Sequence, residues 1–172
     1  MKRKSFLQQL AIGAGGIVAV PYLLNGQQMQ PVNKPAIDPL PAEKVKDFVI
    51  AGHGDLGKVK SMLTEFPTLL YATWDWGNGD FETGLEGAGH VGNKEIANYF
   101  IGLGARTNLF VLTMLGKTQI VKAYLDMYPG YLNARGPHGL TLLHHAQKGG
   151  DDAKELLDYL QSKGLKETKT PL

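Results

Sequence analysis

The sequence predicts an all-α fold, a solenoid of about four stacked helix-turn-helix repeats, and three observations support this prediction. The segments TGLEGAGHVG (83–92) and TLLHHAQKGG (141–150) superpose as Thr, x, Leu, x, x, Ala, three variable residues and Gly. Each is followed by a charged segment with apolar residues at helical spacing. Two more divergent copies occupy 45–54 and 107–116. Such a period predicts helix pairs that stack around one core.

The first helix of each repeat is predicted from small residues and glycines. Ala51, Ala88 and Ala146 are small enough for neighbouring helices to approach closely. Thr83 and Thr141 are suited to begin helices, because a threonine hydroxyl accepts a bond from a free backbone N–H. Glycine ends each segment, where it permits the positive φ that reverses the chain. These glycines are Gly54, Gly92, Gly116 and Gly150.

The second helix of each repeat is predicted by one stripe of apolar residues. The stripes are Val59, Met62 and Leu63; Ile96, Tyr99 and Phe100; Ile120, Val121, Tyr124 and Leu125; and Leu156, Leu157 and Leu160. A single helix pair cannot bury its stripe alone, whereas four stacked pairs form a continuous core. The predicted repeat domain therefore spans 44–164.

The repeat resembles that of the ankyrin family, whose consensus reads Thr-Pro-Leu-His-x-Ala-Ala-x-x-Gly before a second helix. The matching residues are Thr83, Leu85, Ala88 and Gly92 in the second copy, and Thr141, Leu143, His144, Ala146 and Gly150 in the last. Gly84 and Leu142 replace the proline, and Glu86 replaces the histidine. The resemblance implies an ankyrin-like solenoid with finger loops that binds a protein in its concave groove. It also implies that His144 bonds the threonine of its own turn.

Residues 1–26 are predicted to be an export signal or an N-terminal anchor. Basic residues at 2–4 precede an apolar stretch at 10–24, which is the order typical of export signals. Residues 3–8 (RKSFLQ) resemble the twin-arginine export signature, with Lys4 in place of the second arginine. The layout looks like that of exported bacterial ankyrin-repeat proteins. A periplasmic or envelope-anchored location is therefore expected.

Two short segments flank the predicted repeat domain. Residues 27–43 contain four prolines, which predicts an extended linker rather than a helix. If the signal stays uncleaved, this linker would tether the domain to a membrane. Residues 165–172 are predicted to be a C-terminal tail.

Composition excludes several classes of function. The absence of cysteine excludes disulfides, thiolate zinc sites and a cysteine nucleophile. The formal charge is +2, and removal of the signal with its three basic residues leaves −1, which does not suit nucleic-acid binding. No catalytic residue, metal ligand or cofactor is assigned from the sequence. The expected molecule is a monomeric protein-binding module rather than an enzyme.

The segment TWDWGNGDFET (73–83) is the predicted partner-binding finger. It is longer and more aromatic than a simple connection requires, and tryptophan buries a large area at low entropic cost in protein interfaces. The candidate binding residues are Trp74, Asp75, Trp76, Asp80 and Glu82, with Glu86 and His90 in the adjoining helix. The alternative for both tryptophans is a place in the core.

Two other functions stay open. His90 follows Glu86 by four residues, so both share a helix face, and with Glu82 they could form a small metal-binding or hydrolytic site. A metal shared with His144 or His145 is disfavoured, because repeats two and four would lie about 20 Å apart. Surface or interface positions are expected for His53, His90, His138 and His145. The second alternative is a self-associating structural protein of the envelope.

Overall fold

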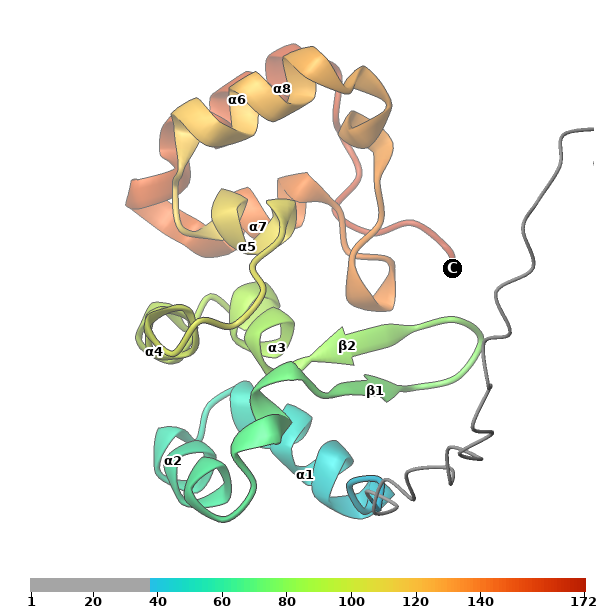
Figure 1. The fold of residues 1–172 in the computed structure, drawn as a ribbon. Helices are drawn as coiled ribbons and strands as arrows, with labels where there is room; N and C mark the ends of the chain where they lie inside the picture. The colour runs from blue at the N-terminus through green and yellow to red at the C-terminus, as the bar shows by residue number, and fades with distance from the viewer. Residues whose placement is uncertain (1–37) are drawn as a thin grey trace, which may run out of the picture. The chain divides into compact units, whose positions relative to one another are not determined.

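Helix pairs make up most of the structure, a computed structural model that describes residues 38–172. The pairs are α1 (Ala42–Gly52) with α2 (Leu56–Glu65), α3 (Gly84–Val91) with α4 (Lys94–Gly102), α5 (Leu109–Met114) with α6 (Thr118–Met127), and α7 (Leu142–Gly149) with α8 (Lys154–Ser162). The short 3₁₀ helices are η1 (Pro67–Tyr71), η2 (Pro129–Asn133), η3 (Pro137–Gly139) and η4 (Gly150–Ala153). The prediction of a mostly helical protein is confirmed (Figure 1). The predicted export signal and most of the predicted linker lie outside the described residues.

The first helices of the pairs pack against one another in succession. Helix α1 contacts α3, α3 contacts α5, and α5 contacts α7. Helix α3 also contacts α7 directly. Helix α5 has only six residues and is therefore about 9 Å long, against about 12 Å for each of its eight-residue neighbours. Because α5 is this short, part of α3 faces part of α7.

Side-chain caps begin several helices, and both predicted threonine caps are confirmed. Thr83 Oγ1 accepts the backbone N–H of Glu86 at 3.2 Å, and Glu86 Oε2 accepts the N–H of Thr83 at 2.8 Å. This reciprocal pair is a capping box. Thr141 caps α7 through its hydroxyl alone, which accepts the N–H of His144 at 3.5 Å. Asn108 caps α5, where its side chain accepts the N–H of Val111 at 3.0 Å.

The glycine turns follow the prediction in three of four places. Gly92, Gly116 and Gly150 have positive φ. The prediction is wrong for Gly54. There the N–H groups of His53 and Gly54 bond to carbonyl groups of the last turn of α1, so the chain leaves the helix without a left-handed residue.

Two apolar clusters form the core, and they contain most of the predicted stripe residues. The first includes Phe48, Val59, Met62, Ile96 and Phe100, and the second includes Val121, Leu125, Leu142, Leu156 and Leu160. Ile120 was predicted in the stripe of α6 but is 55% exposed. Val121 and Leu125 occupy the buried side of α6. Ile120 directly precedes Val121 in the helix and therefore points away from that side.

The predicted finger is a β-hairpin that extends from the helices (Figure 1). Strand β1 (Thr73–Asp75) pairs antiparallel with β2 (Phe81–Thr83), with Trp74 opposite Glu82. Its turn uses positive φ at residues 77–79, and Asp75 accepts the N–H of Gly77 at 2.7 Å. Because side chains alternate along a strand, Asp80 and Glu82 face inward and are buried, whereas Phe81 faces outward.

The two ends of the described chain differ slightly from the predicted boundaries. Helix α1 begins at Ala42, two residues before the predicted start of the repeat domain. The segment 165–172 returns along residues 139–141 through backbone hydrogen bonds. Within residues 38–172, none of the helices has the length and apolar character needed to cross a membrane.

Candidate metal centre

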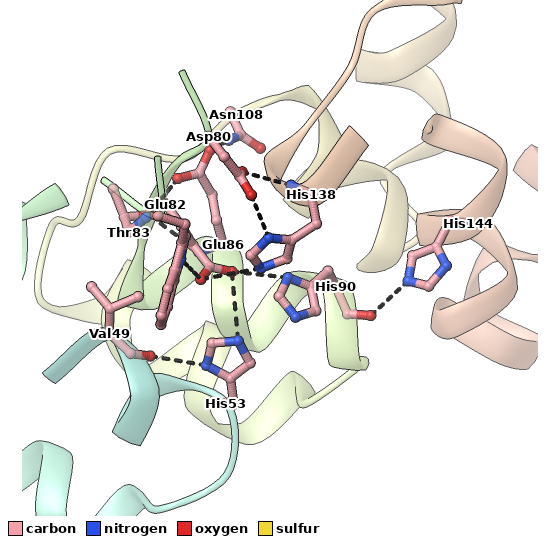
Figure 2. Close-up of polar contacts among 11 residues, drawn as sticks. Val49, His53, Asp80, Glu82, Thr83, Glu86, His90, Asn108, His138 and His144 are labelled. Atoms are coloured by element: carbon pink, nitrogen blue, oxygen red, sulfur yellow. Dashed lines mark hydrogen bonds and ion pairs between the residues drawn. The ribbon is translucent and has the colours of Figure 1, made fainter. Parts of the chain in front are cut away.

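Four side chains from separate parts of the fold converge on one point (Figure 2). His53 follows α1, Glu82 lies on β2, His90 lies on α3 and His138 lies in η3. One nitrogen or carboxylate oxygen of each lies within 4.8 Å of the corresponding atom of the other three. The cluster therefore offers three imidazoles and one carboxylate to a single centre.

Close packing between α1 and α3 places His53 in this cluster. A Cβ atom at Gly52 would overlap the carbonyl oxygen of Gly84, so only glycine allows the helices this approach. A Cβ at Gly87 would lie 2.8 Å from ring atoms of His53. The two glycines therefore leave the space that the imidazole fills, and the His53 and His90 rings lie 4.7 Å apart between centroids.

Glu82 is the anionic group of the cluster and is completely buried. Its Oε2 accepts the indole N–H of Trp76 at 2.8 Å. Its Oε1 lies 2.9 Å from His90 Nδ1 and 3.5 Å from His53 Nε2. Trp76 thus holds Oε2, which also lies 3.5 Å from His138 Nε2, while Oε1 faces His90 and His53.

The pKa of Glu82 lies below its ordinary value. Burial alone would raise this pKa, because it penalises the charged form. The close contact with His90, the charges of His53 and His90, and the Trp76 hydrogen bond together outweigh that effect. Glu82 is therefore ionised at neutral pH, as a metal ligand must be.

Two of the imidazoles have their tautomer set by outer contacts. His53 Nδ1 lies 2.9 Å from the carbonyl oxygen of Val49, which can only accept a hydrogen bond. His138 Nδ1 lies 2.7 Å from Asp80 Oδ2. In its neutral form each ring would therefore carry its proton on Nδ1 and present Nε2 to the centre. Carbonyl and carboxylate groups orient metal-binding histidines in this way.

The backbone of His138 has an unusual conformation. Its φ is 60°, in the left-handed region that a side chain other than glycine or asparagine rarely adopts. Asp80 holds it there, because Oδ1 accepts the N–H of His138 at 2.7 Å. Conformations of this kind cost about 1–3 kcal/mol and concentrate at functional sites.

Two buried atoms of the cluster have no hydrogen-bond partner. Among the described residues, Glu82 Oε1 and His90 Nδ1 are the buried side-chain polar atoms in this state. They lie 2.9 Å apart, yet their orientation is not that of a hydrogen bond. Leaving such groups unpaired costs about 1–3 kcal/mol each. A cation between them would satisfy both at once.

The spacing of His90 and His53 around Glu82 Oε1 is close to that of ligands around a tetrahedral zinc ion. Zinc binds nitrogen and oxygen at about 2.0–2.2 Å, which places the ligand atoms about 3.3 Å apart. The distances from Glu82 Oε1 to His90 and His53, 2.9 and 3.5 Å, bracket this value. His138 Nε2 lies 3.5 Å from the other oxygen, Oε2, and the four ligand atoms lie within 4.8 Å of one another. The side chains of His53 and His138 are 28% and 30% exposed, which gives an ion access from solvent.

The structure separates the predicted finger residues into two groups. Asp80, Glu82 and His90 belong to the cluster or contact it, and Trp76 bonds to Glu82. Trp74 is half-buried and stacks edge-on against Trp76, with ring centroids 6.3 Å apart. Asp75 is exposed and closes the hairpin turn.

Glu86 does not join His90, although the two were predicted to share a site. Its Oε2 accepts bonds from the N–H and hydroxyl of Thr83, both at 2.8 Å. Its Oε1 accepts the side-chain amide of Asn108 at 2.6 Å. Glu86 is thus a structural link between the caps of α3 and α5.

Three expectations for the histidines are corrected. Repeats two and four are not 20 Å apart, since His144 Nε2 lies 2.9 Å from the carbonyl oxygen of His90 across the α3–α7 contact. The ankyrin resemblance implied a bond between His144 and Thr141. The His144 ring instead bonds to the carbonyl of His90. His145 is not a surface residue: it is 1% exposed, and its Nδ1 donates to the carbonyl of Thr141 at 2.8 Å. His90 is likewise buried.

Sequence reasoning missed His53 and His138 as members of one site. One available signal was that His53 and His90 end the first helices of consecutive repeats and therefore stack. The spacing of Asp80 and Glu82 was another, since residues two apart on a strand share a face. No family model, no curated protein and no solved structure matches this chain.

Proposed function

We propose that this protein binds one divalent transition-metal ion, with zinc the best fit, through His53, Glu82, His90 and His138. The observation that supports this most directly is the pair of buried, unpartnered atoms, Glu82 Oε1 and His90 Nδ1. They lie 2.9 Å apart without the geometry of a hydrogen bond. A shared cation would account for their position, their burial and the outer contacts that turn Nε2 of the other two rings toward the centre.

The donor set selects the class of ion. Three imidazole nitrogens and one carboxylate oxygen suit zinc and its neighbours in the first transition row. Calcium and magnesium prefer all-oxygen sites. Because the chain has no cysteine, none of the ligands would be lost to oxidation. Such a site suits the oxidising surroundings that the predicted export signal implies.

The proposed ion would join segments that are distant in the sequence. Its ligands come from the end of α1, the hairpin, α3 and the η3 loop. We propose that the helix pairs form an ankyrin-like solenoid, in which the hairpin and the η3 loop are fingers. The succession of contacts from α1 to α7 and the threonine caps of α3 and α7 support this proposal. The ion would then connect two fingers, the hairpin and the η3 loop, to the first helices of the first two repeats.

The site supports metal binding better than hydrolysis. The hydrolytic alternative relied on Glu86 as a free carboxylate, and both oxygens of Glu86 are engaged by Thr83 and Asn108. Glu82 is held by Trp76 and faces the imidazoles. We therefore propose a binding or fold-stabilising role for the ion.

Metal titration tests the proposed function. Full-length protein is stripped with a chelator and titrated with Zn²⁺ against a chromophoric competitor. We expect one tightly bound equivalent, and a rise in melting temperature because an ion that binds only the folded state stabilises it. Cobalt substitution should give the visible absorption of a tetrahedral nitrogen–oxygen site. Binding of no zinc, or unchanged binding in both His90→Ala and His138→Ala, would contradict the proposal.

A second candidate function is the binding of a protein partner by the hairpin. It is favoured by the exposure of aromatic residues there: Phe81 is 56% exposed and Trp76 is 37% exposed. Phe81 faces away from the metal ligands, so Phe81→Ser is expected to abolish capture of a partner from an extract of the source cells without changing zinc affinity. Equal capture by the variant and the wild-type protein would exclude a hairpin interface.

A further inference from the structure

The C-terminal segment pairs with the chain beside the loop that carries His138. The N–H of Thr141 donates to the carbonyl of Thr168 at 3.0 Å, and the N–H of Thr170 donates to the carbonyl of Gly139 at 2.9 Å. Leu140 and Lys169 face each other as an antiparallel bridge. These bonds surround the residues that immediately follow His138.

Side chains strengthen the same contact. The hydroxyl of Thr141 donates to the carbonyl of Glu167 at 2.7 Å, and the guanidinium of Arg135 donates to the carbonyl of Pro171. Arg135 precedes the η3 loop and Thr141 follows it. The segment 167–171 therefore spans both ends of the loop.

The approach at Gly139 leaves no space for a side chain. A Cβ at this position would overlap the carbonyl oxygen of Thr170. Gly139 has a φ of 73°, and it follows His138, whose φ is 60°. Two consecutive left-handed residues, one of them a histidine, are costly unless their surroundings hold them. On one side Asp80 holds the loop, and on the other side the C-terminal segment holds it.

Resting on the proposed metal site, we infer that residues 167–171 are a positioning segment for the ligand His138. The segment fixes the conformation of the η3 loop and thereby keeps His138 Nε2 directed at the centre. It contacts no other member of the cluster in the bonds described above. Metal affinity depends on ligands held close to their bound geometry by such supporting contacts. By linkage, zinc binding and docking of the segment strengthen each other by the same factor.

A proline substitution tests this inference in the full chain. Thr170→Pro removes the N–H that bonds to Gly139. Thr170→Ala keeps this N–H, loses only the longer 3.5 Å contact of the hydroxyl with the same carbonyl, and serves as the matched control. We expect Thr170→Pro to bind zinc about 10-fold more weakly, the size of effect seen when outer contacts of metal ligands are lost. Thr170→Ala is expected to bind as the wild-type protein does. Equal zinc affinity in all three proteins would overturn the inference.

A double-mutant cycle separates positioning from general destabilisation. If the segment acts through His138, Thr170→Pro should cost nothing further in zinc affinity once His138 is replaced by alanine. The same loss in both backgrounds would overturn the inference. Cobalt spectra supply a second readout, since Thr170→Pro should shift the visible bands in the direction of His138→Ala.

A glycine pair covers the case in which Thr170→Pro unfolds the protein. Gly139→Ala and Gly104→Ala both place alanine at positive φ, but nothing lies within 4 Å of a Cβ at Gly104. Only Gly139→Ala should weaken zinc binding, and equal affinities would overturn the inference. If the wild-type chain itself binds no zinc, the proposed function fails together with this inference. If the wild-type chain binds and the variants match it, only this inference fails.

Discussion

Glu82→Gln is expected to lower zinc affinity by at least about 100-fold. The substitution removes the only negative charge among the four ligands and keeps the side-chain shape. Loss of outer-shell contacts already costs about 10–100-fold in metal affinity, and loss of a charged ligand should exceed it. The measurement is competition titration of the stripped protein, as for the wild type. A variant that binds within a fewfold of the wild type would show that Glu82 is not a ligand.

Glu86→Gln is the matched control for this prediction. Glu86 lies four residues further on, but its oxygens bond to Thr83 and Asn108 rather than to the cluster. Glu86→Gln should therefore lower the melting temperature, because it weakens a capping box and the link to α5. Its zinc affinity should stay near that of the wild type. The reverse pattern would favour the Glu86 and His90 pair over the site proposed above.

Acid is expected to destabilise the metal-free protein through His145. Burial lowers the pKa of His145 from 6.5 to about 4 and outweighs its bond to the carbonyl of Thr141. Between these two values the unfolded chain binds a proton that the folded chain does not, so stability falls as pH falls. The contribution is complete above pH 6.5 and lost by about pH 4. A shift of this size corresponds to about 3 kcal/mol.

Urea unfolding in the presence of a chelator, at pH 7 and pH 4, measures this loss. Comparison with His145→Gln isolates it, because every other titrating group is shared by the two proteins. The wild-type protein should lose about 3 kcal/mol more free energy of unfolding than the variant over this range. Identical losses would show that His145 is not buried as a neutral ring.

The helical part of the fold was open to prediction because its signals are local. Helix boundaries follow from features such as Thr83 and Thr141, whose caps involve residues three positions away. Burial of Val59 or Leu156 follows from spacing within one helix. The exposed Ile120 shows the limit of this reasoning. The predicted apolar stripe on α6 included one residue that is exposed, because packing against neighbouring helices determines which residues at the margin of a stripe are buried.

The candidate site depends on distances that the sequence does not contain. The four ligands, His53, Glu82, His90 and His138, belong to different segments. A uniform repeat spacing would place His138 far from the other three. The short α5 and the α3–α7 contact remove that separation. The left-handed backbone of His138 is equally hidden, because Asp80, 58 residues earlier in the chain, accepts its N–H. Local propensity would have placed that histidine elsewhere.

The hairpin has a consequence for optical experiments. Trp74 and Trp76 are the two tryptophans of the chain, both lie in β1 or its turn, and one of them bonds to Glu82. Tryptophan fluorescence of this protein is therefore a local signal that follows the hairpin and its carboxylate, whereas far-ultraviolet circular dichroism follows the helices. Where the fluorescence changes at the lower temperature, the hairpin opens before the helices melt. Where the two signals change together, the finger and the helix pairs unfold as one cooperative unit.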